Sequence, residues 1–429
     1  MEDERRTILL SNQKDHELHE GIELKSFMSF LKWVCVDQSS LWRASLSWSV
    51  FLFLAIGVPV LSHFLLDCSS TCDADHTRPY HVPVQISLSL FATLSFFCIS
   101  RWARKYGLRR FLFIDKLFDH SEKVRHGYKE QLQKSMRLLY VVVLLFFAIE
   151  TAYKIWWYIS GGTQVPHYGN LYLSDTIACI LEICSWLYRT TLFFLVCVLY
   201  QLICFLQILR LEDFARVFQR ETEVELILID HLSIRRNLRI ISHRFRAFVL
   251  LSLIMVTASQ LAALLMATRA SSQVNIFKAG ELALCSMSLI SGLFICLRSA
   301  TKVTHRAQSI TGLAAKWHLC ATINSFDYTD GETPTTQISS AQVFPLGSEC
   351  ESDTEEGDAD DDLDDAKMVP IFAHTISFQK RQALVNYLET NRAGITVYGF
   401  VVDRAWLHSI FAIQLALLLW LLNKTIGIS

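Results

Sequence analysis

The stretch Leu138-Leu-Tyr-Val-Val-Val-Leu-Leu-Phe-Phe-Ala148 decides the fold class, because it is apolar throughout and contains no turn signal. With the residues that follow as far as Trp157, it forms a block of roughly 20 residues, the length at which an α-helix crosses about 30 Å of hydrocarbon. Lipid offers no hydrogen-bond partner to the backbone, so a helix is the expected conformation of such a block. The stretch therefore predicts a membrane-spanning helix.

Six further blocks repeat this pattern and predict an all-α polytopic fold with seven transmembrane helices. The chain is 52% hydrophobic, and these blocks hold most of that content. The fourth block would measure about 50 Å as a helix, so it must tilt, bend or project from the bilayer, with its uncharged half, 192–209, expected in lipid. The predicted spans are 47–66, 82–100, 138–157, 176–209, 248–268, 279–297 and 397–422.

Lysine and arginine residues alternate along the chain in a way that predicts the orientation. They are concentrated in the segments 101–137 and 210–246, whereas the segments that alternate with these contain few. Because positively charged loops stay in the cytosol, we expect a cytosolic N-terminus and a C-terminal tail outside. We expect an integral protein of the plasma membrane, with another endomembrane as the alternative.

The organisation that follows combines the spans with cytosolic segments. Residues 323–368 predict a disordered acidic cytosolic linker, because repelling charges cannot bury a core. This linker is interpreted either as a solvated spacer or as a calcium-sensing or phosphorylated tether, with Ser352 and Thr354 as candidate phosphosites. The predicted parts are a cytosolic N-terminal segment (1–46), helices 1–6 with basic loops (47–322), the linker (323–368), a cytosolic helix (369–396), and helix 7 with a short outside tail (397–429).

Several cytosolic pieces carry helical patterns of their own. Residues 371–391 place Leu384, Val385 and Leu388 on one face, and the sixth span continues as a helical pattern towards Cys320. Together with the overrunning fourth span and the basic segments, these pieces predict a helical layer beneath the membrane.

Catalytic and nucleotide-binding signatures are missing from the sequence: it has no Walker loop, HExxH or Gly-x-Ser-x-Gly motif. We therefore expect no enzyme activity, no cofactor and no metal site. The formal net charge of −1 favours no nucleic-acid partner. Cys68 and Cys72 lie in a predicted outside loop, where a disulfide and two free thiols are equally compatible with their spacing.

Charged residues inside the spans are the first candidate site. A charge at the centre of a spanning helix costs about 2.5–3.5 kcal/mol on insertion scales, so such residues usually face partners or water. One interpretation is an outward-facing cavity that binds a small molecule; the alternative is mutual neutralisation between packed helices, beginning with an ion pair at i, i+4. The candidates are Glu150, Lys154, Glu182, Arg189 and Glu281.

The seventh span carries the second candidate site, a mostly apolar stripe with sparse polar groups. Such a stripe lines a pore with a hydrophobic constriction, or it packs against another helix through one hydrogen bond. Spacing favours packing. The pore-lining candidates are Asp403, Leu407, Ser409, Ile410, Gln414, Leu418 and Leu421.

The start of this span, Phe400-Val-Val-Asp-Arg-Ala-Trp-Leu-His-Ser-Ile410, resembles the start of the last helix in insect gustatory and odorant receptors. Over nearly its whole length the chain is similar to the plant family of gustatory-receptor-like membrane proteins. The motif is an aromatic residue, then Asn or Asp followed by Arg, and a Ser-Ile pair. Further along the helix, Ala416-Leu417 and Asn423-Lys424 stand where the insect receptors carry Thr-Tyr and Gln-Phe.

This resemblance implies a homo-oligomer, tetrameric as in the insect proteins, that forms a cation channel gated by an unknown small molecule. It further implies that helix 7 lines the pore, that the ligand binds between earlier spans in the outer half, and that cytosolic helix extensions hold the subunits together. Two alternatives remain from the residues alone: a non-conducting scaffold or signalling protein acting through the acidic tether, and a G-protein-coupled receptor. The predicted cytosolic N-terminus opposes the receptor alternative.

Overall fold

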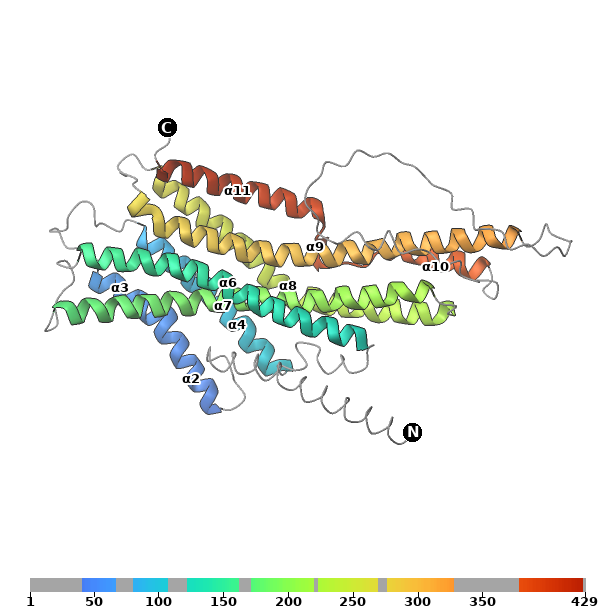
Figure 1. Ribbon diagram of the computed structural model, residues 1–429, viewed down its shortest axis with the longest axis horizontal. Helices are drawn as coiled ribbons and strands as arrows, with labels where there is room; N and C mark the ends of the chain where they lie inside the picture. Colours follow the sequence, from blue (N-terminus) through green and yellow to red (C-terminus); the bar gives the residue numbers. More distant parts are fainter. Residues whose placement is uncertain are drawn as a thin grey trace, which may run out of the picture. The chain divides into compact units, whose positions relative to one another are not determined.

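The computed structural model describes residues 41–66, 80–106, 122–161, 171–219, 223–268, 276–327 and 378–426 (Figure 1). These residues form helices and one short hairpin. The elements are α2 (Leu41–Phe51), η1 (Leu52–Gly57), α3 (Val58–Leu66), α4 (His81–Tyr106), α6 (Glu122–Gly161), α7 (Leu171–Ala215), η4 (Arg216–Gln219), α8 (Val224–Ala267), α9 (Ile276–Asp327), α10 (Phe378–Thr390), β1 (Thr396–Val397), β2 (Phe400–Val401) and α11 (Arg404–Ile426). Cys68, Cys72, Ser352, Thr354 and the acidic linker lie outside the described residues.

Seven helices in the described ranges are long and apolar enough to cross a membrane, which confirms the predicted number of spans. Each coincides with a predicted block, although most helices extend well beyond the apolar residues that identified them. The orientation of these helices stays a prediction. The spans are Trp42–Phe64, His81–Lys105, Glu130–Ile159, Leu173–Phe218, Val224–Met266, Gly280–Thr322 and Arg404–Asn423.

The first span changes its helical form around Pro59. Proline has no N–H and cannot pair with the carbonyl four residues earlier, that of Ala55. The preceding residues form the π-helix η1, in which the Val58 N–H bonds to Phe53 O. Two neighbouring helices satisfy the carbonyls released in this way: Ser89 Oγ donates to Ala55 O at 2.8 Å, and Ser185 Oγ donates to Leu54 O at 2.6 Å. Hydroxyl groups of α4 and α7 thus hold α2–α3 in place.

The chain divides into two compact units, and helices α7, α8 and α9 contribute residues to both. The larger unit comprises residues 1–210, 235–306 and 393–429, and the smaller comprises 211–234 and 307–392. In the most apolar stretches of α7 and α9, 78% and 72% of residues are buried, against 17% in α11. Helices α7 and α9 are therefore the central helices, and α11 is the least covered span.

The smaller unit contains some of the pieces that the sequence predicted to pack together, whereas the basic segment 101–137 and residues 235–246 belong to the larger unit. Phe218 contacts Trp317 edge-on at 5.8 Å between ring centroids, and His231 contacts Tyr387 at 5.7 Å. On α10 the predicted apolar face is buried, with Leu384 3% exposed and Leu388 2% exposed. Helix α9 continues past Leu297 as predicted, and it ends at Asp327, seven residues beyond Cys320.

The predicted start of the seventh span at Val397 is wrong, because a β-hairpin precedes the helix. Thr396 pairs with Val401 and Val397 with Phe400 in antiparallel register. Tyr398 and Gly399 make the turn with φ values of 49° and 94°, as a two-residue hairpin loop requires. The alternation of β-branched and aromatic residues around a glycine was the available signal for this hairpin.

The hairpin is tied to α8 and α9 by side-chain hydroxyl groups. The Thr396 N–H donates to Ser242 Oγ at 3.0 Å, and the Ile395 N–H donates to Thr304 Oγ1 at 3.1 Å. These bonds fix the position from which α11 departs.

Candidate functional site

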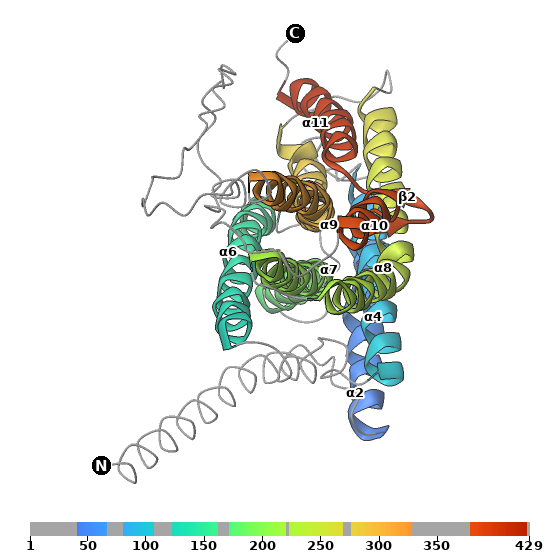
Figure 2. The ribbon, with the colours of Figure 1, turned by 90° about the vertical axis from the view of Figure 1, so that its right-hand side faces the viewer.

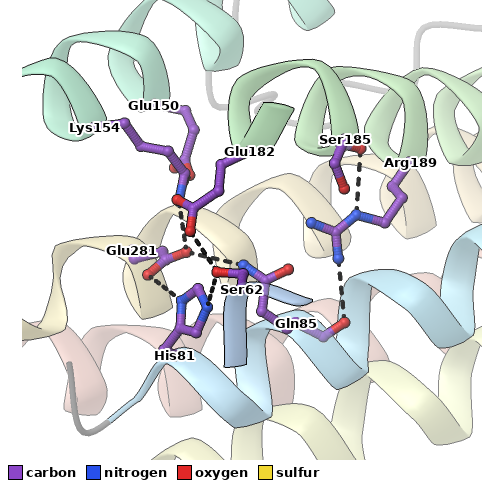
Figure 3. Close-up of polar contacts among 9 residues, drawn as sticks. All are labelled: Ser62, His81, Gln85, Glu150, Lys154, Glu182, Ser185, Arg189 and Glu281. Carbon is purple, nitrogen blue, oxygen red and sulfur yellow. Dashed lines mark hydrogen bonds and ion pairs between the residues drawn. The ribbon is translucent and has the colours of Figure 1, made fainter. Parts of the chain in front are cut away.

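Lys154 lies at the centre of a buried charge cluster formed by three helices (Figure 3). Its Nζ is 2.8 Å from Glu182 Oε2 on α7, 3.4 Å from Glu281 Oε1 on α9, and 3.6 Å from Glu150 Oε1 on its own helix α6. All four side chains are at most 4% exposed. The predicted i, i+4 pair is therefore present, but it is one contact of a larger network.

Three polar residues that the sequence alone did not single out complete this cluster. Ser62 of α3 donates to Glu182 Oε1 at 2.5 Å and lies 3.1 Å from His81 Nε2. His81 of α4 places Nδ1 3.6 Å from Glu281 Oε2, and Gln85 Nε2 donates to Glu281 Oε1 at 3.5 Å. The available sequence signal was that all three are polar residues near the ends of the first two apolar blocks. The search for charged residues within the spans did not include them.

Arg189 is buried near the cluster but forms a different set of contacts. Its guanidinium donates to Ser185 O and to Gln85 O, both at 3.3 Å (Figure 3). It also donates to Ser89 Oγ at 3.2 Å. Glu182, seven residues earlier on α7, is instead turned to Lys154. Of the five predicted cavity residues, the structure thus brings four together and places the fifth among carbonyl and hydroxyl oxygens.

The contacts among these charges are those that mutual neutralisation predicts. Burial of an unpaired charge is costly, whereas a buried ion surrounded by hydrogen-bond partners is tolerated. Within the described ranges, no group of three or more His, Cys, Asp or Glu side chains is arranged to hold a metal ion. The cluster is accordingly an ion-pair network that connects α3, α4, α6, α7 and α9 of the larger unit.

The pore-lining candidates of α11 divide between two environments. Gln414, Leu418 and Leu421 are 2%, 8% and 1% exposed because they pack against the chain itself. Gln260 of α8 donates to Gln414 O at 3.4 Å, and the ring of Phe411 lies 4.9 Å from that of Phe294 of α9, between centroids. This face therefore packs against α8 and α9, the alternative that spacing favoured, and Figure 2 shows α11 beside both helices.

The other candidates lie away from this packing face or at its edge. Leu407 and Ile410 are half-buried, and Ser409 is exposed. Asp403 precedes the helix and caps it, since the Trp406 N–H donates to Asp403 Oδ1 at 2.9 Å. An aspartate at this position satisfies a free backbone N–H of the first turn.

The face of α11 opposite Gln414 carries small residues that are all exposed. At about 100° per residue they lie roughly half a turn from the packing face. Small residues are common where transmembrane helices approach each other closely, whereas lipid-facing surfaces carry large apolar side chains. We call this surface the small-residue face; it comprises Ala405, Ser409, Ala412 and Ala416.

Comparison with known families places most of the chain within one of them. Residues 22–413 match the family described as "Protein of unknown function (DUF3537)". The chain belongs to this family. A search of curated proteins found no match.

Solved structures similar to this DUF3537 member include those of an insect receptor. The olfactory receptor OR5 from Machilis hrabei in complex with eugenol matches with a TM-score of 0.55 at 12% identity, covering 94% of this chain and 99% of that one. The same receptor without eugenol matches with a TM-score of 0.53, identical coverage and 12% identity. The chain thus has an insect olfactory-receptor-like fold, as the motif around Asp403 predicted.

Proposed function

We propose that the chain is one subunit of a homo-oligomeric cation channel that a small molecule opens, with the small-residue face of α11 beside the ion path. The observation that carries this proposal is the surface of α11. It is the span with the smallest buried share. The side that its own chain leaves exposed bears the small-residue face with Ser409, flanked by large apolar side chains such as those of Trp406 and Leu419. The small-residue face suits contact with other copies or with water, whereas the large side chains beside it suit contact with lipid.

The fold comparison supports the same proposal. An olfactory receptor solved in complex with eugenol shares the fold over nearly the whole of both chains, so binding of a small organic molecule is compatible with this architecture. A tetramer is the oligomer that the resemblance to the insect receptors implies. The plasma membrane is the location that we propose.

The orientation is proposed from the basic segments alone. Residues 101–137 and 210–246 carry most of the lysine and arginine between the spans, and such segments resist transfer across lipid. An epitope tag before Met1 should therefore be reached by antibody only after cells are permeabilised, and a tag after Ser429 in intact cells. Labelling of both tags on one side of the membrane would contradict the seven crossings and the channel proposal with them.

The channel proposal is tested with Ser409→Cys and Asp403→Asn in protein reconstituted in planar bilayers. We expect cation currents in the unmodified channel, and we expect a positively charged thiol reagent to reduce them in Ser409→Cys more than in the unaltered protein, whose native cysteines serve as the control. Asparagine caps helices as well as aspartate, so Asp403→Asn should preserve stability while lowering cation conductance. A monodisperse tetramer of Ser409→Cys whose α11 helices do not cross-link through the introduced thiol would exclude a central position for this helix.

A further inference from the structure

A groove lies between the first two spans, with η1 and α3 on one side and α4 on the other. It encloses about 380 Å³, within the range of roughly 300–1,000 Å³ typical of small-molecule sites. Its walls are almost entirely apolar and include Ala55 of η1 and Pro59 of α3. A groove of this volume with apolar walls can take an alkyl or aromatic group.

The rim of the groove is formed by apolar side chains that the chain leaves exposed. Val60, Ile86 and Leu90 are 46%, 54% and 52% exposed. Both flanking helices are membrane spans by length and composition, so such side chains meet lipid. A ligand dissolved in the bilayer can therefore enter the groove from the side. Its occupancy of the groove then depends on the concentration of the ligand in the lipid.

One end of the groove is polar and reaches the charge cluster. Gln85 lines the groove and is 7% exposed. Its amide nitrogen faces the Glu281 carboxylate, so its oxygen is turned away from Glu281 (Figure 3). Among the described residues, that oxygen has no hydrogen-bond partner. A buried acceptor without a donor is unfavourable, so a donor group on a ligand gains a hydrogen bond there.

The charge behind this end favours a cation. In the part of the chain that the structure describes, two basic side chains, those of Lys154 and Arg189, contact the cluster or the backbone of Gln85. They stand against three carboxylates, so the formal charge with His counted as neutral is −1. Charges interact strongly where water is excluded. The groove therefore attracts an ammonium group and repels a carboxylate. The carboxylates are those of Glu150, Glu182 and Glu281.

We propose that this groove binds a lipophilic amine, with the ammonium group donating to Gln85 Oε1 and the apolar body lying between α3 and α4. The inference deepens the ligand-binding part of the proposed function, on which it rests, and names the chemical class of the ligand. Its test measures binding without any current, so that failure of the channel proposal and failure of this one are distinguishable.

The test uses n-octylamine, with n-octanol and octanoate as analogues of equal chain length, on the full chain in lipid nanodiscs. A diazirine-bearing alkylamine is cross-linked by light, and the labelled peptides are identified by mass spectrometry. We expect labels within residues 55–64 and 82–93. We expect octylamine to suppress labelling at roughly tenfold lower concentration than octanol, since a hydrogen bond to a charged group is stronger than one between neutral groups, and octanoate not to suppress it.

Two pairs of variants separate specific binding from general change. Ile86→Trp fills the groove from its exposed rim and should abolish labelling, whereas Ile180→Trp, at an equally exposed site on α7 outside the groove, should not. Gln85→Leu removes the acceptor and should cost octylamine about tenfold in competition. Thr93→Val is its control, because the Thr93 hydroxyl already donates to Ser89 O.

Each contrary result would overturn the proposal. Equal competition by octylamine and octanol would show that the groove binds any alkyl chain without preference for an amine, including the chains of membrane lipids. Competition by octanoate, or unchanged labelling in Ile86→Trp, would show that the amine binds elsewhere. If Gln85→Leu fails to yield a monodisperse protein, the Ile86→Trp and Ile180→Trp pair decides the question alone.

Discussion

Replacement of Lys154 by methionine is expected to destabilise the protein severely. The variant would leave the carboxylates of Glu150, Glu182 and Glu281 buried without the ammonium group that contacts all three. Breaking a buried ion pair by removing one partner costs about 3–5 kcal/mol, because the remaining charge stays uncompensated. The apparent melting temperature and the monodisperse fraction in one detergent measure this loss.

Lys134 provides a matched control for Lys154 on the same helix. It pairs with Glu130 at 2.8 Å with the same i, i+4 spacing, but both side chains are more than half exposed. Exposed pairs contribute at most about 1 kcal/mol, so Lys134→Met should leave the melting temperature nearly unchanged. Adding Glu182→Gln to Lys154→Met should recover part of the loss. Equal melting temperatures for Lys154→Met and Lys134→Met would show that the buried cluster contributes no more to stability than an exposed ion pair.

Substitution of alanine for Gly292 is expected to have the next largest effect. A methyl group at Gly292 of α9 would lie within 2.7 Å of Phe193 Cζ and closer still to Cε1. Phe193 of α7 is 2% exposed and packs edge-on against Phe91 at 5.0 Å, so its ring has little room to withdraw. Overpacking of this kind costs about 1–3 kcal/mol, and thermal unfolding of the purified protein measures it.

Gly312 on the same helix is the control for Gly292. No described atom beyond its own helix lies within 4 Å of the position that its Cβ would take. Alanine there should stabilise α9 by up to about 1 kcal/mol, since glycine weakens a helix interior. Phe193→Leu combined with Gly292→Ala should restore stability. A melting temperature for Gly292→Ala equal to that of Gly312→Ala would contradict close packing of α7 on α9.

The spans were predictable because a long apolar block has one stable conformation in lipid, and Leu138–Ala148 shows this most directly. The ends of the helices were less predictable, since α7 and α9 continue through polar residues whose burial depends on partners distant in sequence. The hairpin at 396–401 was missed because an apolar segment beside a span satisfies the same composition test as the span itself.

The charge cluster was predictable in part for a related reason. Spacing on one helix identified the contact between Glu150 and Lys154, because both residues share a face. It could not identify Glu281 or His81 as neighbours of that pair, since the packing of separate helices sets those contacts. The same limit applies to α11, where helical periodicity defined the stripe containing Gln414 but not the direction in which that stripe faces.

The hairpin before α11 determines how the last helix can move. Its turn is rigid, because Tyr398 and Gly399 occupy backbone conformations that few sequences accept, while its anchorage is two hydrogen bonds to the hydroxyl groups of Ser242 and Thr304. If one of these hydrogen bonds is lost, the turn and the start of α11 are expected to shift together, because the turn itself bends very little. Loss of the Ser242 or Thr304 hydroxyl group would therefore free the start of α11 to tilt, while the contacts of Phe411 and Gln414 with α9 and α8 would still hold the rest of the helix.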